Sequence, residues 1–422
     1  MEKLIISSIG PIKKISIDLG KINVLIGPQS SGKSIIAKIL SFCQWVEKRY
    51  FLDRSFKYSA IEELLNYHHL GPAFFSDESS FYYESNYLKI EYKGKALNRI
   101  ITQKERSNEY KVTKNIYIPS ERNFVSAIPN LSKYKENNDN VMSFVYDWYS
   151  AKRHYNKNNC LKVLDLGVSY YNDEEPDNDM LTISNNNLEF QLNEGSSGLQ
   201  SLVPMLIMVD YLSLEIENKG RISSVSEQDN MLKMISTAMN ELFSKKRIKE
   251  LSKDVGTDDF NLSNTEVDQL LQFINRRTTY SCSKFIIEEP EQNLFPQTQS
   301  DLVYYLINRM KINSGHFLFL TTHSPYILYA LNNCLLAGIL KDKVPTEVRR
   351  ELKCYKSAIS PEDVNVWEMV GSTGGLKKIN NSDLKTINDH YFNTIMSEIL
   401  DEYYTLLSYL DEGQVNKSAA KS

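Results

Sequence analysis

Residues 27–34 constrain the fold of this chain more than any other part of the sequence. They read Gly-Pro-Gln-Ser-Ser-Gly-Lys-Ser and match the pattern G-x-x-x-x-G-K-[ST]. A mostly apolar run at residues 22–26 precedes them, and a helical pattern begins near Ser34. Because this motif between a strand and a helix forms a phosphate-binding loop, the sequence predicts an α/β P-loop fold.

Each residue type in this loop has a physical role. Gly27 and Gly32 let backbone N–H groups curl around a polyphosphate without obstruction from side chains. Lys33 is expected to reach the β and γ phosphates, and the hydroxyl of Ser34 to ligate magnesium. The helix that follows points the positive end of its dipole at the same anion. The predicted phosphate contacts are Gly27, Gln29, Ser30, Ser31, Gly32, Lys33 and Ser34.

Two later apolar strands each deliver polar side chains at their carboxyl ends. Residues 285–287 are followed by Glu288 and Glu289, and residues 317–322 by His323. Since successive residues at a strand end point in different directions, the two acids can have different roles. Glu288 is predicted to support magnesium, and Glu289 to orient or deprotonate the attacking water. His323 is predicted to contact the γ-phosphate or that water, because open α/β sheets bind ligands at this edge.

Composition and charge narrow the class of protein. With 422 residues, 41% of them apolar, the chain can bury a large core as one elaborated domain or two domains. The net charge of −4 shows no overall basic excess of the kind that nucleic-acid binding favours. Local basic clusters at residues 245–249 and 276–277 keep DNA open as a partner, although such runs are usually solvated faces.

Cysteine usage and hydropathy predict a cytoplasmic protein. The five cysteines are scattered, odd in number and without a C-x-x-C pair, which argues against a zinc site and a disulfide framework. The N-terminus lacks the apolar segment of a signal peptide, and no run approaches the roughly 18 apolar residues of a membrane span. We therefore expect a reducing compartment and no membrane partner.

The pattern of apolar residues predicts an elaborated head. Residues 80–195 are predicted as an antiparallel β subdomain and residues 217–281 as a helical insertion. The predicted fold class is thus α/β, a central mostly parallel sheet with these two additions. Residues 1–335 are assigned to the head and residues 336–422 to an α/β extension packed on it. No heptad region runs long enough for a coiled-coil arm of many tens of residues.

Four features in a fixed order carry a family resemblance: the phosphate loop, Ser-Ser-Gly-Leu-Gln at residues 196–200, the acidic strand and the histidine. Together they resemble the ATP-binding-cassette (ABC) type of ATPase. Residues 10–14, 117–122 and 288–296 resemble more closely the AAA-family ATPases grouped with the OLD, RecF and SMC proteins. The resemblance covers roughly residues 1–335 and is specific as a set.

This resemblance implies a site that needs two copies of the chain. ATP, with Mg²⁺, would bind the loop of one copy and be clamped by the signature segment (residues 196–200) of the other. Ser197, Gly198 and Gln200 would then touch the γ-phosphate bound to the partner copy, and Asn293 would lie in a loop that crosses the interface. A homodimer or higher homo-oligomer is therefore expected.

Several positions depart from the family pattern. Gln29 replaces the usual Asn of the loop, Glu288 replaces the common Asp, and Leu199 replaces the common Gly, departures that bear on turnover rate rather than on nucleotide binding. Gln103 is a candidate for the glutamine that senses magnesium. Arg122 either contacts nucleotide or interface, or braces a loop by a salt bridge.

The resemblance also suggests a biological role. Only 99 residues follow His323, and they show no E…D-x-D constellation for a two-metal nuclease. An effector such as a nuclease is therefore expected to be a separate protein. The leading hypothesis is a sensor or regulator in bacterial antiviral defence. The alternatives are a RecF-like repair ATPase that clamps DNA and a non-hydrolysing scaffold locked by ATP, and a transporter subunit is disfavoured.

Overall fold

A computed structural model of the chain describes residues 2–53, 62–127, 139–173, 177–219, 279–371, 373–381 and 383–409, with a few residues between 242 and 270. The helices predicted within residues 217–281 lie almost entirely outside the described residues. Both basic clusters, at 245–249 and 276–277, also lie outside them.

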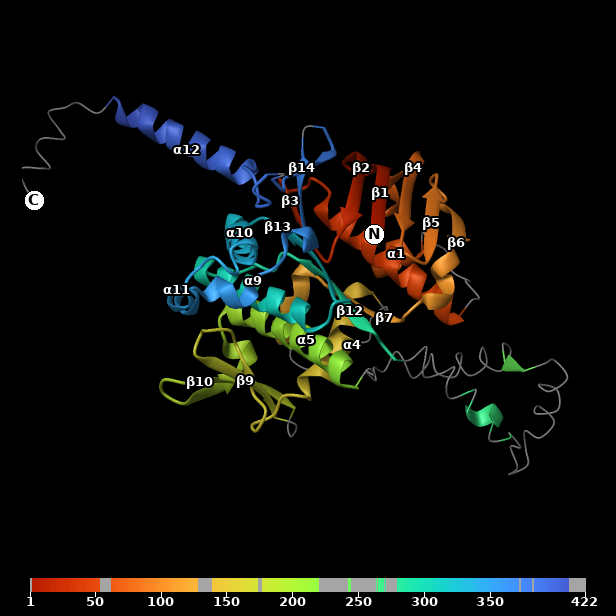
Figure 1. The fold of residues 1–422 in the computed structure, drawn as a ribbon, viewed down its shortest axis with the longest axis horizontal. Coiled ribbons are helices and arrows are strands. Elements are labelled where there is room, and N and C mark those ends of the chain that lie inside the picture. Colours follow the sequence, from red (N-terminus) through yellow and green to blue (C-terminus); the bar gives the residue numbers. More distant parts are fainter. Residues whose placement is uncertain are drawn as a thin grey trace, which may run out of the picture.

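A six-stranded sheet forms the centre of the molecule, in the order β15-β14-β3-β13-β12-β7 (Figure 1). Five strands run parallel: β3 (Ile22–Ile26), β7 (Thr113–Ile118), β12 (Cys282–Glu288), β13 (Phe317–Thr322) and β14 (Val364–Val370). The edge strand β15 (Gly375–Lys378) is antiparallel to β14. Every residue of β3, β12 and β13 is buried, as expected for parallel strands covered on both faces. The predicted α/β class with a central, mostly parallel sheet is confirmed.

Two antiparallel sheets flank this centre. The first has the order β2-β1-β4-β5-β6, and the second the order β11-β10-β9-β8. The strands of the first are β1 (Glu2–Ile9), β2 (Ile12–Leu19), β4 (Phe75–Glu84), β5 (Leu88–Lys93) and β6 (Asn98–Gln103). The strands of the second are β8 (Leu161–Lys162), β9 (Val168–Asp173), β10 (Asn178–Ile183) and β11 (Leu188–Gln191).

The predicted single antiparallel subdomain at residues 80–195 differs from this arrangement, because the stretch is divided among three sheets. Residues 80–103 pair with the N-terminal hairpin, and residues 161–191 form their own sheet. β7 joins the central sheet beside β12 instead. Its last three residues are all buried, which is typical of a parallel core strand rather than of a half-exposed one.

Helices cover both faces of the central sheet. The long ones are α1 (Lys33–Asp53), α4 (Asn140–Lys152), α5 (Ser197–Lys219), α9 (Pro296–Ile312), α10 (Pro325–Ile339) and α12 (Tyr391–Leu407). The short ones are α3 (Phe124–Ala127), α11 (Thr346–Glu351), a π-helical turn at Glu63–Tyr67, and 3₁₀ turns at Pro72–Phe74, Glu105–Glu109, Ser120–Asn123, Leu192–Glu194, Lys353–Ser357 and Pro361–Asp363.

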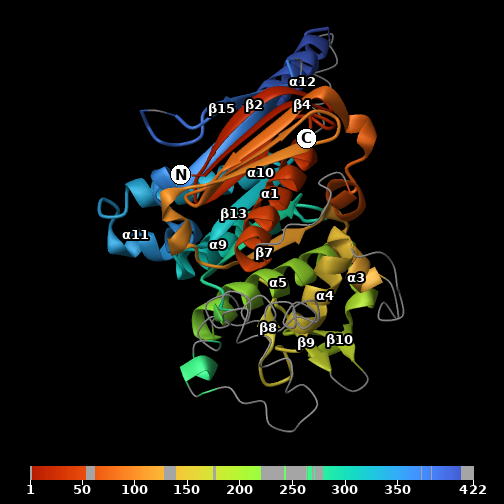
Figure 2. The same cartoon turned by 90° about the vertical axis from the view of Figure 1, so that its right-hand side faces the viewer.

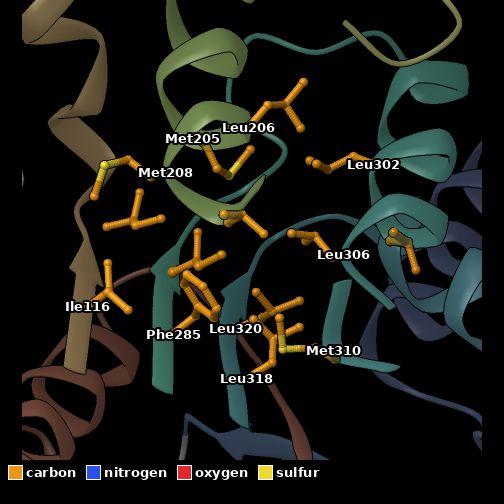
Figure 3. Close-up of a cluster of buried hydrophobic side chains, with 14 of the residues drawn as sticks. Ile116, Met205, Leu206, Met208, Phe285, Leu302, Leu306, Met310, Leu318 and Leu320 are labelled. Atoms are coloured by element: carbon orange, nitrogen blue, oxygen red, sulfur yellow. The ribbon is translucent and has the colours of Figure 1, made fainter. Parts of the chain in front are cut away.

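Neighbouring residues of one strand pack into two separate hydrophobic cores. On β12, Phe285 packs with α5 and α9, whereas Ile286 packs with α1 and the first antiparallel sheet. Figure 3 shows the α5 and α9 side of the sheet, where Met205, Leu206 and Leu302 meet residues of β12 and β13. α1 is thus held between the central sheet and the first antiparallel sheet (Figure 2). This packing fixes the carboxyl ends of β3, β12 and β13 against one another.

α5 contains a segment that could span a membrane by length and composition. Within the described part of the chain this is true of one helix, at residues 197–214. However, 67% of that segment is buried inside the protein, and its side chains belong to the main hydrophobic core. The buried position is that of the core helix of a globular fold.

The C-terminal residues do not form one packed extension. β14 lies within the central sheet and pairs with β3 from Val364–Ile22 to Glu368–Ile26. α12 instead has no buried residue and projects from the body (Figures 1 and 2). The predicted extension at residues 336–422 is therefore partly built into the head and partly exposed.

Candidate functional site

The phosphate-binding loop (residues 27–34) connects β3 to α1 at the carboxyl edge of the central sheet. Gly27 has a φ of 149°, and a Cβ added there would lie 2.6 Å from the Cβ of Met369. Gly32 has a φ of 103°, and a Cβ there would lie 2.9 Å from the side chain of Ile12. Backbone conformation and close packing therefore both require glycine at these two positions.

Lys33 is the first residue of α1, and its ammonium group turns back over the loop. Nζ donates hydrogen bonds to the carbonyl oxygens of Gly27 at 2.9 Å and Pro28 at 2.7 Å. Burial lowers the pKa of Lys33 to about 8, and the nearby carboxylates of Glu289 and Glu291 oppose that shift. A buried cation at a helix N-terminus is suited to binding an anion that supplies the missing charge.

Glu288, the last residue of β12, is 4% exposed, and its Oε1 has no hydrogen-bond partner. Burial raises its pKa, while a hydrogen bond from the Ser34 hydroxyl and the charge of Lys38 oppose the rise. An unpaired buried carboxylate oxygen beside a hydroxyl provides the oxygen ligands that Mg²⁺ prefers. The pair Ser34 and Glu288 therefore fits the predicted metal site.

The described residues contain no group of three or more His, Cys, Asp or Glu side chains suited to a metal.

Glu289 and His323 face each other at the ends of neighbouring strands. His323 Nε2 lies 3.5 Å from Glu289 Oε1, and both side chains are partly exposed. Glu289 adopts a left-handed backbone with φ of 42°, and its N–H donates to the carbonyl of Thr321 at 2.9 Å. Burial, reinforced by the charge of Lys33, lowers the pKa of His323. The lowered pKa favours the neutral imidazole, which can act as both donor and acceptor.

The signature segment lies at the N-terminus of α5, as predicted. A Cβ added to Gly198 would lie 2.8 Å from the carbonyl oxygen of Asn293, so the start of α5 packs directly on the loop after the acidic strand. Gln200 Nε2 donates to the carbonyls of Asn193 and Gly195, both at 2.9 Å. The predicted phosphate contacts of Ser197, Gly198 and Gln200 involve a second copy of the chain and stay predictions.

Arg122 resolves one of the alternatives left open by the sequence. It is 1% exposed and braces a loop; within the described part of the chain it does so through backbone carbonyls rather than through a salt bridge. Its guanidinium donates to the carbonyl oxygens of Glu288 at 2.9 Å, Glu289 at 2.8 Å, Pro290 at 3.3 Å, Ser201 at 3.1 Å and Pro119 at 3.4 Å. Burial lowers the pKa of Arg122 to about 10, so it remains charged at pH 7. The side chain of Arg122 thus links the segment at residues 288–290 to α5, which begins in the signature segment.

Glu291 is a site residue that sequence reasoning assigned no role. Its Oε1 accepts the backbone N–H of His323 at 2.6 Å, and burial raises its pKa. The carboxyl therefore fixes the segment that carries His323 to the loop that carries Glu289. The available signal was its place in the run Glu-Glu-Pro-Glu, where a third acid follows the two that were assigned.

Gln103 does not belong to the site that the structure assembles. It ends β6, the edge strand of the first antiparallel sheet, where it pairs with Leu88 and is exposed. The strand beside β12 is β7, and the turn after it carries Glu121, whose charge contributes to the raised pKa of Glu288. Glu121, unlike Gln103, therefore lies close enough to Glu288 for its charge to act on that carboxyl.

Strand order and site together define a class. The P-loop, the acidic strand end and the histidine stand on the adjacent strands β3, β12 and β13, with the signature at the start of a core helix. The chain is an α/β fold whose central, mostly parallel sheet carries a P-loop between β3 and α1.

Comparisons with solved structures find similar chains at low sequence identity. One is the SMC head domain from Thermotoga maritima, with 10% identity, coverage of 89% of this chain and 97% of that chain, and a TM-score of 0.35. A second is the Smc head domain from Pyrococcus furiosus with an extended coiled coil bound to the C-terminal domain of ScpA, with 9% identity, coverage of 96% and 100%, and a TM-score of 0.41. A third is the recombination mediator protein RecF, with 11% identity, coverage of 89% and 97%, and a TM-score of 0.31. At such identities and TM-scores the likeness says nothing about function. Neither a protein-family model nor a curated protein matches the sequence.

Proposed function

We propose that this chain is an ATPase that binds Mg²⁺-ATP at residues 27–34 and hydrolyses it to ADP and phosphate within a homodimer. The observation that supports this most strongly is the convergence of Lys33, Glu289 and His323. The charge of Lys33 helps to lower the pKa of His323, and the charge of Glu289 opposes the lowering of the pKa of Lys33. Glu289 Oε1 lies 3.5 Å from His323 Nε2. These are the group types needed to hold a γ-phosphate and to activate water.

The chemistry assigned to each side chain follows from its position. Lys33 and the loop N–H groups hold the β and γ phosphates, and Ser34 with Glu288 would hold Mg²⁺, which neutralises charge on the phosphate oxygens. Glu289 accepts a proton as water attacks the γ-phosphorus, and the bond to the bridging oxygen of ADP breaks. The neutral imidazole of His323 positions the water or the transferring phosphoryl group.

The position of the signature segment supports the proposed homodimer. Within one chain its start packs on Asn293, and its N-terminal N–H groups are at the end of a helix suited to an anion. A second copy would bring this helix end to the γ-phosphate bound to the first. Each site would then combine the loop of one chain with the signature of the other.

Phosphate release is the direct test of the enzymatic claim. We expect Mg²⁺-dependent ATP turnover by the purified chain, abolished by EDTA. Gln103→Ala is the matched control and should retain wild-type turnover, because Gln103 lies outside the site. Absence of turnover with tight ATP binding would favour the non-hydrolysing scaffold instead.

The lowered pKa of Lys33 predicts a pH dependence of nucleotide affinity. Bound phosphate stabilises the ammonium, so the pKa of Lys33 rises on binding from its value of about 8. Affinity should therefore be constant below about pH 8 and fall above it, by at most roughly tenfold per pH unit. Dissociation constants measured between about pH 7 and about pH 9.5 check this. A constant affinity over that range would contradict a neutralisable Lys33 in the phosphate site.

Arg122 is assigned a positioning role in the same reaction. Arg122→Met frees the backbone that presents Glu289 but touches no part of the P-loop, so kcat should fall by roughly 10- to 100-fold while ATP affinity stays within about threefold. Arg122→Lys should recover part of kcat, because Lys keeps the charge but loses the planar set of donors. Parallel loss of affinity and kcat would indicate general disruption of the fold and contradict this role.

The biological role we propose is that of a cytoplasmic sensor or regulator that acts with a separate effector, such as a nuclease, in bacterial antiviral defence. Support comes from the residues that resemble the OLD, RecF and SMC group. The test is protection against phage by the chain with its genomic neighbours. Protection should be lost with Lys33→Ala, and an unchanged phage yield would contradict the role.

A further inference from the structure

α12 carries an apolar surface that nothing in the described chain covers. The helix has no buried residue, and eight large apolar side chains on it are between 41% and 71% exposed. These are Ile395, Met396, Ile399, Leu400, Tyr403, Tyr404, Leu406 and Leu407. Soluble proteins rarely leave a contiguous apolar surface of this kind open, and such surfaces usually mark an interaction site.

The spacing on this helix fits pairing with another helix. Met396, Ile399, Tyr403 and Leu406 follow one another at intervals of three, four and three residues, which is the a/d spacing of a coiled coil. We call these four residues the α12 stripe. A helix of 17 residues is marginally stable alone in water, so an exposed one gains most by packing this stripe.

Charge on α12 limits the choice of partner. Residues 391–409 contain Glu398, Asp401 and Glu402 and no Lys or Arg. An anionic membrane surface is therefore disfavoured, because interfacial helices use basic residues there. With the stripe at positions a and d, Glu398 and Asp401 fall at c and f, away from the seam, and Glu402 falls at g, beside it. In a parallel pair, position g of one helix faces position e of the other, where Leu407 lies, so two copies of α12 can pack without one acidic residue facing another.

The base of α12 stands next to the proposed dimer interface. The N–H of Tyr391 donates to Glu368 Oε1 at 3.0 Å, and Glu368 pairs in register with Ile26, directly before the P-loop. The hydroxyl of Tyr329 on α10 donates a hydrogen bond to Asn393 Oδ1 at 3.2 Å, and the Tyr329 side chain is 48% exposed. α10 begins two residues after His323. The apolar surface thus starts at the edge of the sheet where a second copy would approach.

We propose that the α12 stripe binds the same stripe of a second copy of this chain, and that this contact forms without nucleotide. The stripe matches itself in spacing, and in a parallel pair no acidic residue of α12 faces another across the seam. The contact is separate from the ATP-dependent clamp, since it uses no residue of the nucleotide site. It would keep two heads together through the release of ADP.

Molar mass in solution without nucleotide tests this contact. The wild type should show about twice the 48.7 kDa of one chain at tens of micromolar, and Lys33→Ala should show the same. Ile399→Asp should return the mass to that of one chain, and Leu406→Glu, farther along the stripe, should do so independently. Leu188→Asp is the matched control, because Leu188 is 51% exposed on β11 and should leave the dimer intact.

Two results would overturn the proposal. One is a wild type with the mass of a single chain at these concentrations. The other is a folded Ile399→Asp or Leu406→Glu variant, with wild-type circular dichroism, that keeps the doubled mass. Since no nucleotide is present, either result leaves the ATPase proposal standing.

Discussion

Replacing Lys33 with alanine is expected to reduce ATP affinity by at least roughly 100-fold and to bring turnover to background. The ammonium is the one cation that the P-loop itself supplies, and charge-assisted hydrogen bonds contribute about 1.5–3 kcal/mol each. Loss of two such bonds to phosphate corresponds to this fall in affinity. The carbonyls of Gly27 and Pro28 that Lys33 now binds can turn to water, so the fold should persist.

Nucleotide titration and phosphate release measure this effect. Lys48→Ala provides the control on the same helix, because Lys48 bonds to the hydroxyl of Tyr280 rather than to the P-loop. It should bind and turn over ATP like the wild type. Normal ATPase activity in Lys33→Ala would refute the assignment of the site.

Replacing Glu289 with glutamine is expected to lower turnover by roughly 10²- to 10⁴-fold while ATP binding is retained. Glutamine keeps the size and the hydrogen bonding of the side chain but cannot accept the proton of the attacking water. Lys33, Ser34 and Glu288, which hold nucleotide and metal, are unchanged. Single-turnover hydrolysis and equilibrium binding of ATP separate the two effects. Wild-type turnover would show that another group is the base, and loss of binding would show a structural role.

The central sheet and its ligand edge were predictable because their signals are local. The P-loop has a fixed spacing, and runs such as residues 285–287 and 317–320 are apolar throughout, as strands buried on both faces must be. The polar residues after each run therefore identified the edge at which Glu289 and His323 meet.

Contacts between distant segments were not predictable from spacing. β7 was assigned to an antiparallel subdomain because the stretch that contains it shows polar alternation, whereas its actual partner, β12, lies far along the chain. The role of Arg122 depends on carbonyl oxygens more than 160 residues away, and backbone carbonyls leave no trace in sequence. Gln103 was considered for its residue type, but β6 pairs it with the outer sheet.

The exposure of α12 was likewise not predictable from the sequence. Its apolar residues predict a helix packed on the head, since an apolar face normally faces a core. Among the described residues nothing covers that face, and this exposure is the basis for the proposed contact with a second copy. Short heptad spacing of this kind becomes informative only once burial is known.

The measurement that tests the composite ATP site most directly is the molar mass of the double variant Glu289→Gln, Ile399→Asp, with and without Mg²⁺-ATP. Ile399→Asp removes the proposed α12 contact, and Glu289→Gln prevents hydrolysis from releasing the clamp. We expect the mass of one chain without nucleotide, a doubled mass with Mg²⁺-ATP, and no doubling when Ser197→Arg is added. A mass that stays at one chain under saturating Mg²⁺-ATP would contradict a site shared between two copies.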